Sequence, residues 1–259
     1  MIAELDSFPG VASVWCGPIG GPPRFQRAAG EPHYAASTMK VGVMVAAFRH
    51  LDLDRPVRVD NAHRSAVPSA PAFGNDRDDD GDPAVWARLG EDVPLRWLIG
   101  RMIVRSSNLA TNLVLSLTGF DAVNAVWRDA GAASAHTDRG IEDLAARAEG
   151  ITNEVTAADL AALMGSLAGG ALAGPVETAD MLDILFAQEY LEDFAQGLPP
   201  GTRMASKNGW INGVRHCAAV IYPDDAAPYV LTVCTTGTLP DEQTCAMLGR
   251  VAASSWQAR

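Results

Sequence analysis

Residues 203–235 read R-M-A-S-K-N-G-W-I-N-G-V-R-H-C-A-A-V-I-Y-P-D-D-A-A-P-Y-V-L-T-V-C-T, and this stretch decides the fold. It contains runs rich in apolar and β-branched residues, separated by Asn, Gly, Pro and Asp residues that favour turns. The stretch therefore predicts three strands, Arg203–Lys207, Arg215–Tyr222 and Pro228–Thr235. Strands that follow one another through such short connections favour antiparallel pairing in one sheet.

The N-terminal segment completes the predicted sheet. Val11–Cys16 is a β-rich run, and the turn-forming sequence G-P-I-G-G-P-P follows it. Arg24–Ala29 can return as a second strand and so make a hairpin. Paired with the three C-terminal strands, this hairpin gives a five-stranded antiparallel sheet, and Glu242–Gln257 follows as a closing helix.

The middle of the chain is predicted to be mostly helical, because its apolar residues recur with the period of a helix. The predicted helices are the one that starts at Ser37, Leu95–Val104, Ala110–Leu117, Ala122–Asp129, Ala157–Leu167 and Thr178–Tyr190. Residues 61–93 are rich in Pro, Gly and Asp, which favours a long surface loop.

The predicted fold class is α/β (α+β), with a cleft between the sheet and the helices. Residues 1–36 and 196–259 would form a sheet lobe with the terminal helix. Residues 37–195 would form an inserted all-helical lobe, and the two lobes would make one compact unit.

Ser37-Thr38-Met39-Lys40 is the first pattern with catalytic potential. Positions i and i+3 of a helix share a face, so the Ser37 hydroxyl and the Lys40 amine can meet. A serine hydroxyl is a weak nucleophile until a base takes its proton. The apolar sequence that follows predicts burial of Lys40, and a buried lysine can lose its charge and act as that base. The alternative is a helix cap beside a lysine that only reaches solvent.

Two further patterns suit the same chemistry. Ser106 and Asn108 flank one residue at a helix start, where a second hydroxyl can relay a proton and an amide can hold a carbonyl. At the end of a predicted strand, Lys207 can lower the pKa of a neighbouring amine and attract an anionic substrate. Gly209 lets a substrate backbone approach the strand edge. An ordinary N-cap cluster and a strand-end turn are the alternatives.

The patterns S-x-x-K, S-x-N and K-x-G occur here in that order. Together they resemble those of the penicillin-recognising serine enzymes, that is, class A β-lactamases and penicillin-binding proteins. The flanking sequences S-S-N-L-A-T-N-L-V-L and G-V-R-H-C-A-A-V-I-Y-P are also similar to the family, and the likeness runs from about Val11 to Trp256. The resemblance implies a β-lactamase-like fold and catalysis through an acyl-enzyme.

The resemblance also implies a role for each matching catalytic residue. Ser37 would be the acylated nucleophile, and Lys40 would be its base. Ser106 would pass the proton to the leaving nitrogen, while Asn108 would position the substrate. Lys207 would complete the proton network and draw in a substrate carboxylate.

Further matching positions imply substrate binding along the first C-terminal strand. The backbone N–H groups of Ser37 and Trp210 would form an oxyanion hole. Asn208 and Gly209 belong to the same motif, and Arg215 resembles the arginine that binds a substrate carboxylate bidentately. A charge at the strand edge is the alternative for Arg215, and core packing is the alternative for Trp210.

The sequence departs from the family pattern at several positions. In T-D-R-G-I-E-D-L-A-A, Glu142 resembles the deacylating glutamate of class A enzymes, but it lies one residue further from the arginine. Asp143 stands for the family's proline, and Ala146 stands for its supporting asparagine. Ser107 replaces an aspartate, and Asn208 replaces a hydroxyl residue that normally touches the substrate carboxylate. Glu142 is therefore either a water-activating base or a solvated loop carboxylate.

Composition limits the classes of partner. The chain has 259 residues, with 31 Asp and Glu against 20 Lys and Arg, so its formal net charge is −11. This balance argues against nucleic acids and anionic membranes as partners. Lys40 and Lys207 are the only lysines among the 20 basic residues. Because a buried lysine can release its proton and an arginine cannot, their place in the two motifs favours proton transfer.

The sequence indicates neither a metal nor a cofactor. The five histidines lack metal-ligand spacing, and D-R-D-D-D-G at 76–81 lacks the glutamate that closes a calcium loop. The four cysteines form no C-x-x-C pair and favour buried thiols in a reducing compartment. Neither a signal-peptide pattern nor an 18-residue apolar run occurs, so a cytoplasmic location is expected unless a leader was removed.

The predicted function is that of a serine hydrolase that forms an acyl-enzyme at Ser37. Its expected substrate is a small molecule, a β-lactam or a related amide or ester, with an acyl group and a carboxylate. One alternative is an acyltransferase or cyclase of a cytosolic biosynthetic pathway, in which an amine or alcohol replaces water. The other is a homologue that binds its ligand without turnover.

Overall fold

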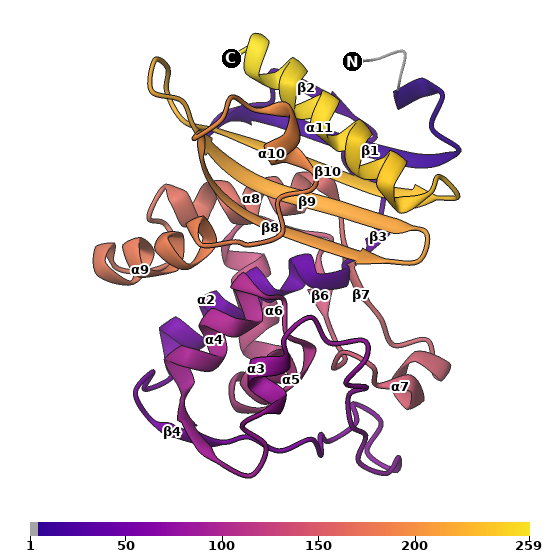
Figure 1. Ribbon diagram of the computed structural model, residues 1–259, viewed down its shortest axis with the longest axis vertical. Helices are drawn as coiled ribbons and strands as arrows, with labels where there is room; N and C mark the ends of the chain where they lie inside the picture. The colour runs from indigo at the N-terminus through magenta and orange to yellow at the C-terminus, as the bar shows by residue number, and fades with distance from the viewer. Residues whose placement is uncertain (1–4) are drawn as a thin grey trace.

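One antiparallel sheet of five strands forms the upper half of the molecule in Figure 1, a computed structural model that describes residues 5–259. Across the sheet the strands are β2 (Phe25–Arg27), β1 (Gly10–Pro18), β10 (Tyr229–Gly237), β9 (Val214–Tyr222) and β8 (Arg203–Ile211). The predicted five-stranded antiparallel sheet is thereby confirmed. The first four residues of the N-terminal segment lie outside the described part of the chain.

Strand β8 is longer than the sequence predicted. It continues four residues past Lys207 to Ile211, which pairs with Val214 across the two-residue turn Asn212-Gly213. Gly213 has a φ of +77°, a conformation that such tight hairpin turns require. The prediction that Lys207 ends the strand was therefore wrong, since Lys207 pairs with Ala218 inside the ladder.

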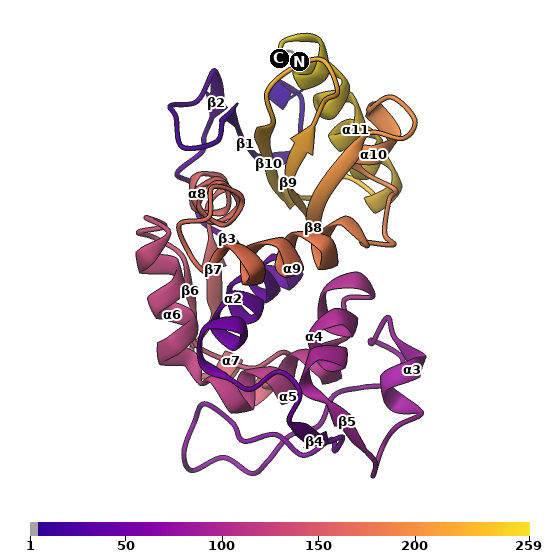
Figure 2. The ribbon, with the colours of Figure 1, turned by 90° about the vertical axis from the view of Figure 1, so that its left-hand side faces the viewer.

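Both faces of the sheet are covered, which explains why its strands are almost continuously apolar. Val220 and Val230 belong to the larger core, whereas their neighbours Ile221 and Leu231 belong to the smaller one. Helix α11 (Asp241–Gln257) and the short α10 (Phe194–Gly197) pack on the face of the smaller core, and α8 (Ala157–Ala168) packs on the other face (Figure 2). Side chains in each strand thus alternate between two apolar layers.

Helix α2 (Lys40–His50) lies between the sheet and the other helices of the lower half (Figure 2). Residues 40–48 are all buried, as expected for a helix that is apolar on every side. The 3₁₀ turn η1 (Ala36–Met39) precedes it, so Ser37 lies in this turn and not in the α-helix predicted to start there.

The remaining helices surround α2 or lie at the edge of the lower half. They are α3 (Pro83–Trp86), α4 (Leu95–Val104), α5 (Asn108–Thr118), α6 (Phe120–Asp129), α7 (Leu144–Ala148) and α9 (Pro175–Phe186). Helix α9 ends four residues earlier than predicted, which leaves residues 187–193 as a loop beside β8. The predicted division into a sheet lobe and a helical lobe stays a prediction.

Two small sheets were not predicted, because strands of two or three residues are too short to show an alternating pattern. One contains β3 (His33–Tyr34), β7 (Asn153–Val155) and β6 (His136–Thr137), and the other contains β4 (Pro56–Arg58) and β5 (Asp92–Pro94). The predicted surface loop 61–93 is also interrupted, since it contains α3 and the start of β5.

Within residues 5–259, no single helix is long and apolar enough to cross a membrane. Helices α5 and α6 have the required length and composition only as a pair, and this pair is bent by 89°.

Candidate active site

Ser37 lies where the turn η1 meets strand β8. An ideal Cβ atom on Gly209 would lie 2.7 Å from the backbone nitrogen of Ser37 and 3.0 Å from that of Thr38. Only a glycine therefore allows the strand to approach the turn so closely. Ser37 is half-buried, as is Trp210, the next residue of β8. The predicted nucleophile Ser37 thus lies beside β8, the strand that carries the predicted oxyanion donor Trp210.

Lys40 is fully buried at the start of α2. Its Nζ donates to the backbone oxygen of Ser106 at 2.7 Å, to Oδ1 of Asn108 at 2.9 Å and to Oγ of Ser106 at 3.2 Å. Within residues 5–259, no hydrogen bond joins Nζ to the Ser37 hydroxyl. The structure thus connects the amine to the S-x-N motif, and direct contact between Lys40 and Ser37 stays a prediction.

The surroundings of Lys40 favour its neutral form. Burial lowers its pKa well below the ordinary lysine value, and the positive charge of Lys207 lowers it further. The carboxylates of Asp80 and Glu142 act in the opposite direction. Burial also lowers the pKa of Lys207, to about 7. Both amines therefore release their protons more readily than an ordinary lysine does.

Ser106 and Ser107 mark the start of helix α5. Ser106 has a φ of +55°, in the left-handed region that residues other than glycine rarely adopt. Ser107 is the N-cap of the helix, and its Oγ donates to Asp80 at 3.0 Å. The backbone nitrogen of Leu109 donates to the same carboxylate at 2.9 Å. Asp80 thus stabilises the helix N-terminus, which gives this part of the acidic stretch a structural role.

Glu142 lies next to the same motif. Its Oε1 accepts from Nδ2 of Asn75 at 3.1 Å and from Nδ2 of Asn108 at 3.3 Å. Its Oε2 accepts from the backbone nitrogen of Asp76. Burial raises its pKa, and these hydrogen bonds oppose that rise. The glutamate thus contacts Asn108, which also holds Lys40, and is not an isolated loop carboxylate.

Polar contacts hold the loop that carries Glu142, in which Asp143 stands where the family pattern has a proline. Asp143 is buried, and it accepts from the Ser65 hydroxyl and from the backbone nitrogens of Ala66 and Ala146. The side chain of Asn112 binds both backbone groups of Ile141, donating at 2.8 Å and accepting at 2.8 Å. The departure at Asp143 therefore still leaves a well-anchored loop.

Asn75 and Asn112 contact this loop but were not among the predicted site residues. Asn112 lies four residues after Asn108 in the quoted motif, and residues at that spacing share a helix face, so a signal for it existed. Asn75 lies in the irregular stretch before α3, where no periodicity marks a residue that becomes buried.

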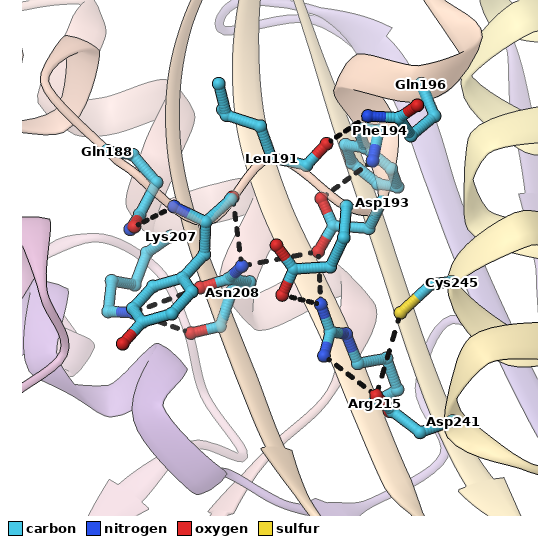
Figure 3. Close-up of polar contacts among 12 residues, drawn as sticks. Gln188, Leu191, Asp193, Phe194, Gln196, Lys207, Asn208, Arg215, Asp241 and Cys245 are labelled. Atoms are coloured by element: carbon cyan, nitrogen blue, oxygen red, sulfur yellow. Dashed lines mark hydrogen bonds and ion pairs between the residues drawn. The ribbon is translucent and has the colours of Figure 1, made fainter. Parts of the chain in front are cut away.

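Lys207 and Asn208 lie in the middle of β8 and are both buried. Nζ of Lys207 donates to the backbone oxygen of Asn208 at 2.8 Å and to its Oδ1 at 3.3 Å. Nδ2 of Asn208 donates to the backbone oxygen of Tyr190 and to Asp193, at 3.2 and 3.4 Å (Figure 3). Hydrogen bonds within the protein thus use both ends of this amide.

Arg215 is buried on the neighbouring strand and paired with acidic side chains. Its Nη2 lies 2.7 Å from Glu192 Oε1 and 3.4 Å from Asp193 Oδ2. Its Nη1 lies 3.3 Å from Asp241 Oδ2. The structure therefore places this predicted carboxylate ligand among three carboxylates of the protein itself.

The ring of Trp210 contacts an aromatic ring and a cation. The centre of its ring lies 4.9 Å from that of Tyr190, edge to face, and the Arg215 guanidinium carbon lies 5.1 Å from it. This packing restrains the side chain of Trp210, the residue whose backbone N–H is a predicted oxyanion donor.

Comparison with known proteins agrees with these features. A family model described as the Beta-lactamase enzyme family matches residues 2–258. Among curated proteins, no sequence matches significantly. The solved class A beta-lactamase of the last common ancestor of Gram-negative bacteria is 25% identical, with a TM-score of 0.83 over 99% of this chain and 97% of its own.

Two further solved structures share the fold at lower identity. A beta-lactamase from Sphaerobacter thermophilus is 22% identical, with a TM-score of 0.79, over 99% of this chain and 94% of its own. PBP-A is 21% identical, with a TM-score of 0.81, over 99% and 92%. The motifs, the five-stranded sheet and a match along almost the whole sequence all agree, and the chain belongs to the beta-lactamase enzyme family.

Proposed function

We propose that the protein is a serine hydrolase that forms an acyl-enzyme at Ser37 on a β-lactam or a related amide or ester. Family membership and fold support a function of the serine hydrolase type. The observation that carries the finer proposal is the hydrogen-bonded network of Lys40, Ser106, Asn108 and Glu142, which begins three residues after the half-buried Ser37.

Acylation would begin with removal of the Ser37 proton. Lys40 is suited to this step, because burial and the charge of Lys207 favour its neutral amine. The Ser37 oxygen then bonds to the substrate carbonyl carbon, and the backbone N–H groups of Ser37 and Trp210 would stabilise the oxyanion. As the bond to the leaving nitrogen or oxygen breaks, Ser106 would deliver the proton to it, since its hydroxyl lies 3.2 Å from Lys40 Nζ.

Deacylation would use Glu142 as the general base. The carboxylate would take a proton from water, whose oxygen attacks the carbonyl carbon of the acyl-Ser37 ester. The bond to the Ser37 oxygen then breaks, and that oxygen takes the proton back. Asn75 and Asn108 orient Glu142 through the two hydrogen bonds to its Oε1. A raised pKa makes the carboxylate a stronger base than an exposed one.

One observation favours acyl transfer as a second candidate function. Glu142 accepts three hydrogen bonds within the protein, and an ionised carboxylate has about four acceptor positions. The room left for binding a water molecule is therefore small. Slow hydrolysis would give an amine or alcohol time to attack the acyl-enzyme instead.

A chromogenic cephalosporin combined with intact-protein mass spectrometry tests the proposal. The expected result is a mass adduct on the wild-type protein that is absent in Ser37→Ala. Glu142→Gln should accumulate this adduct, because the variant keeps the acylating groups and loses the deacylating base. Absence of both adduct and turnover would overturn the β-lactam proposal. A persistent wild-type adduct without turnover would instead indicate a protein that binds its ligand covalently.

A further inference from the structure

The Arg215 cluster consists of Arg215, Glu192, Asp193 and Asp241, and it joins three elements. Arg215 belongs to β9, Glu192 and Asp193 to the loop after α9, and Asp241 to the first turn of α11. The Arg215 side chain is only 3% exposed, and both of its terminal nitrogens bind carboxylates of the cluster. A substrate carboxylate would have to compete with these partners.

Asp193 ties the cluster to the predicted substrate-binding strand. Its Oδ2 accepts from Asn208 and from Arg215, each at 3.4 Å, as Figure 3 shows. Its Oδ1 accepts from the backbone nitrogen of Phe194 at 2.7 Å and so caps α10. Asp193 is therefore fixed by the fold, and it draws the amide of Asn208 and the guanidinium of Arg215 toward the same carboxylate.

The formal charges of Lys207 and of the Arg215 cluster sum to a negative value. Lys207 and Arg215 carry two formal positive charges, and the cluster carries three carboxylates. The side chains of Glu192 and Asp241 are 45% and 60% exposed, so their charges act on an arriving ligand. Trp210, Arg215 and Asp241 also line a surface cavity of about 310 Å³. Like charges that face one another across an interface repel, so these carboxylates disfavour a ligand that carries a negative charge there.

The geometry points to a substrate class: amides, esters or lactams whose leaving group carries no negative charge, with Glu192 and Asp241 as the residues that set this specificity. The inference rests on the proposed function, because it needs a leaving group that sits between Ser106 and the end of β8. It replaces the sequence-based expectation of a substrate carboxylate. That expectation treated Lys207 and Arg215 as free to bind an anion, and both are engaged within the protein.

Two thioesters that differ only in leaving-group charge test this inference. Both thioesters carry a phenylacetylglycyl acyl group. The leaving group is thioglycolate, an acid, in one and methyl thioglycolate, an uncharged ester, in the other. A thiol reagent measures the release of either thiol. The C–S bond breaks as the Ser37 oxygen bonds to the carbonyl carbon, and the thiol leaves with the proton. After division by the uncatalysed rates, we expect the wild-type protein to favour the methyl ester in kcat/KM by about tenfold.

The charge variant Glu192→Gln/Asp241→Asn should shift this ratio toward the acid by about tenfold, because it frees Nη1 of Arg215 and removes two charges. Adding Arg215→Gln to that variant should abolish the gain. Glu189→Gln is the matched control, since Glu189 lies in the same loop but pairs with Arg105. Its ratio should equal that of the wild-type protein.

The outcomes separate the inference from the proposed function. A Ser37-dependent reaction that favours the acid in the wild-type protein would overturn the inference alone. A ratio that the charge variant does not change would also overturn it, because Glu192 and Asp241 would not set the specificity. Failure of both thioesters to react at Ser37 would overturn the proposed function together with the inference.

Discussion

Nζ of Lys40 lies 2.9 Å from Oδ1 of Asn108. The Nδ2 atom of the same amide donates to Glu142 at 3.3 Å. An amide has one acceptor end and one donor end, so a single orientation of Asn108 serves both the Lys40 amine and the Glu142 carboxylate. The two candidate bases are therefore linked through one side chain, and a change in that side chain should affect both chemical steps.

Asn108→Asp tests this link. The new carboxylate would attract the Lys40 cation and repel Glu142, so the pKa of Lys40 should rise. Acylation needs the neutral amine, and we therefore expect its pH profile to move to higher pH by about one unit. The measurement is the rate of adduct formation at Ser37 as a function of pH. An unchanged profile would show that Asn108 does not couple to the base.

The charge of Lys207 should also affect the pH profile of acylation. Its charge lowers the pKa of Lys40, so Lys207→Met should raise that pKa and shift the rise of acylation with pH to more alkaline values. Lys207→Arg keeps a positive charge and should keep the midpoint closer to that of the wild-type protein. Single-turnover acylation rates from pH 5 to pH 10 measure both variants. Identical midpoints for Met and Arg would mean that this charge does not act on Lys40.

Asn75 should act in deacylation through Glu142. Its Nδ2 donates to Oε1 of the glutamate at 3.1 Å, and its Oδ1 accepts from Asn112 at 3.0 Å. Asn75→Ala removes this support, and we expect deacylation to slow by about tenfold to a hundredfold while acylation changes little. Burst kinetics with a chromogenic substrate separate the two steps.

Asn61→Ala is the control for a general disturbance of this loop. Asn61 holds the backbone of residue 75 through two hydrogen bonds, but it makes no hydrogen bond with Glu142. If both variants slow deacylation equally, loop anchoring and not the Asn75 amide explains the effect. Glu142→Gln in the Asn75→Ala background should add little further loss, because both changes act on one group.

The motifs proposed as catalytic could be located in the sequence because each is local. Ser37 and Lys40 lie three residues apart, and Ser106 and Asn108 lie two residues apart. Such short spacings are visible in the sequence without knowledge of the fold. The contacts of Asn75 and Asp193 could not be predicted, because both residues lie in irregular segments. Their positions depend on how a loop folds back onto another element, and no period in the sequence encodes that.

The fold was predicted where apolar runs alternate with turn residues, and it was missed where buried residues are polar. Strand β8 seemed to end at Lys207 because Lys and Asn are typical of exposed turns. Both are buried there, and hydrogen bonds within the protein satisfy them. Such compensation is a property of the tertiary structure, so composition alone placed the strand end four residues too early.

Gly209→Ala tests the close approach of β8 to the Ser37 turn. The added methyl group would lie 2.7 Å from the Ser37 nitrogen, and the strand or the turn must move to accept it. Because small displacements of reacting groups are costly, we expect acylation to fall by about a hundredfold. Gly100→Ala is the control, since a Cβ atom added at Gly100 would meet nothing within 4 Å. This control should keep its acylation rate and gain a little thermal stability.

His33 should make the fold sensitive to acid. It is buried, its two ring nitrogens contact the hydroxyls of Ser13 and Thr236 at 2.9 and 2.8 Å, and the ring of His216 lies 5.5 Å away. Burial, together with the nearby His216, lowers the pKa of His33 from 6.5 to about 4. Between these two values the unfolded chain binds a proton that the folded protein does not.

The free energy of unfolding should therefore be largest above pH 6.5 and fall as the pH is lowered toward about 4. Urea unfolding at pH 7.5, 5.5 and 4.5 measures this loss. His33→Gln keeps a hydrogen-bonding side chain without a titrating ring, so its stability should fall less over the same range, although it starts from a lower value at pH 7.5. The slope that remains in the variant should come in part from His216, whose pKa burial also lowers. A variant with the full wild-type slope would exclude His33 as a source of the acid sensitivity.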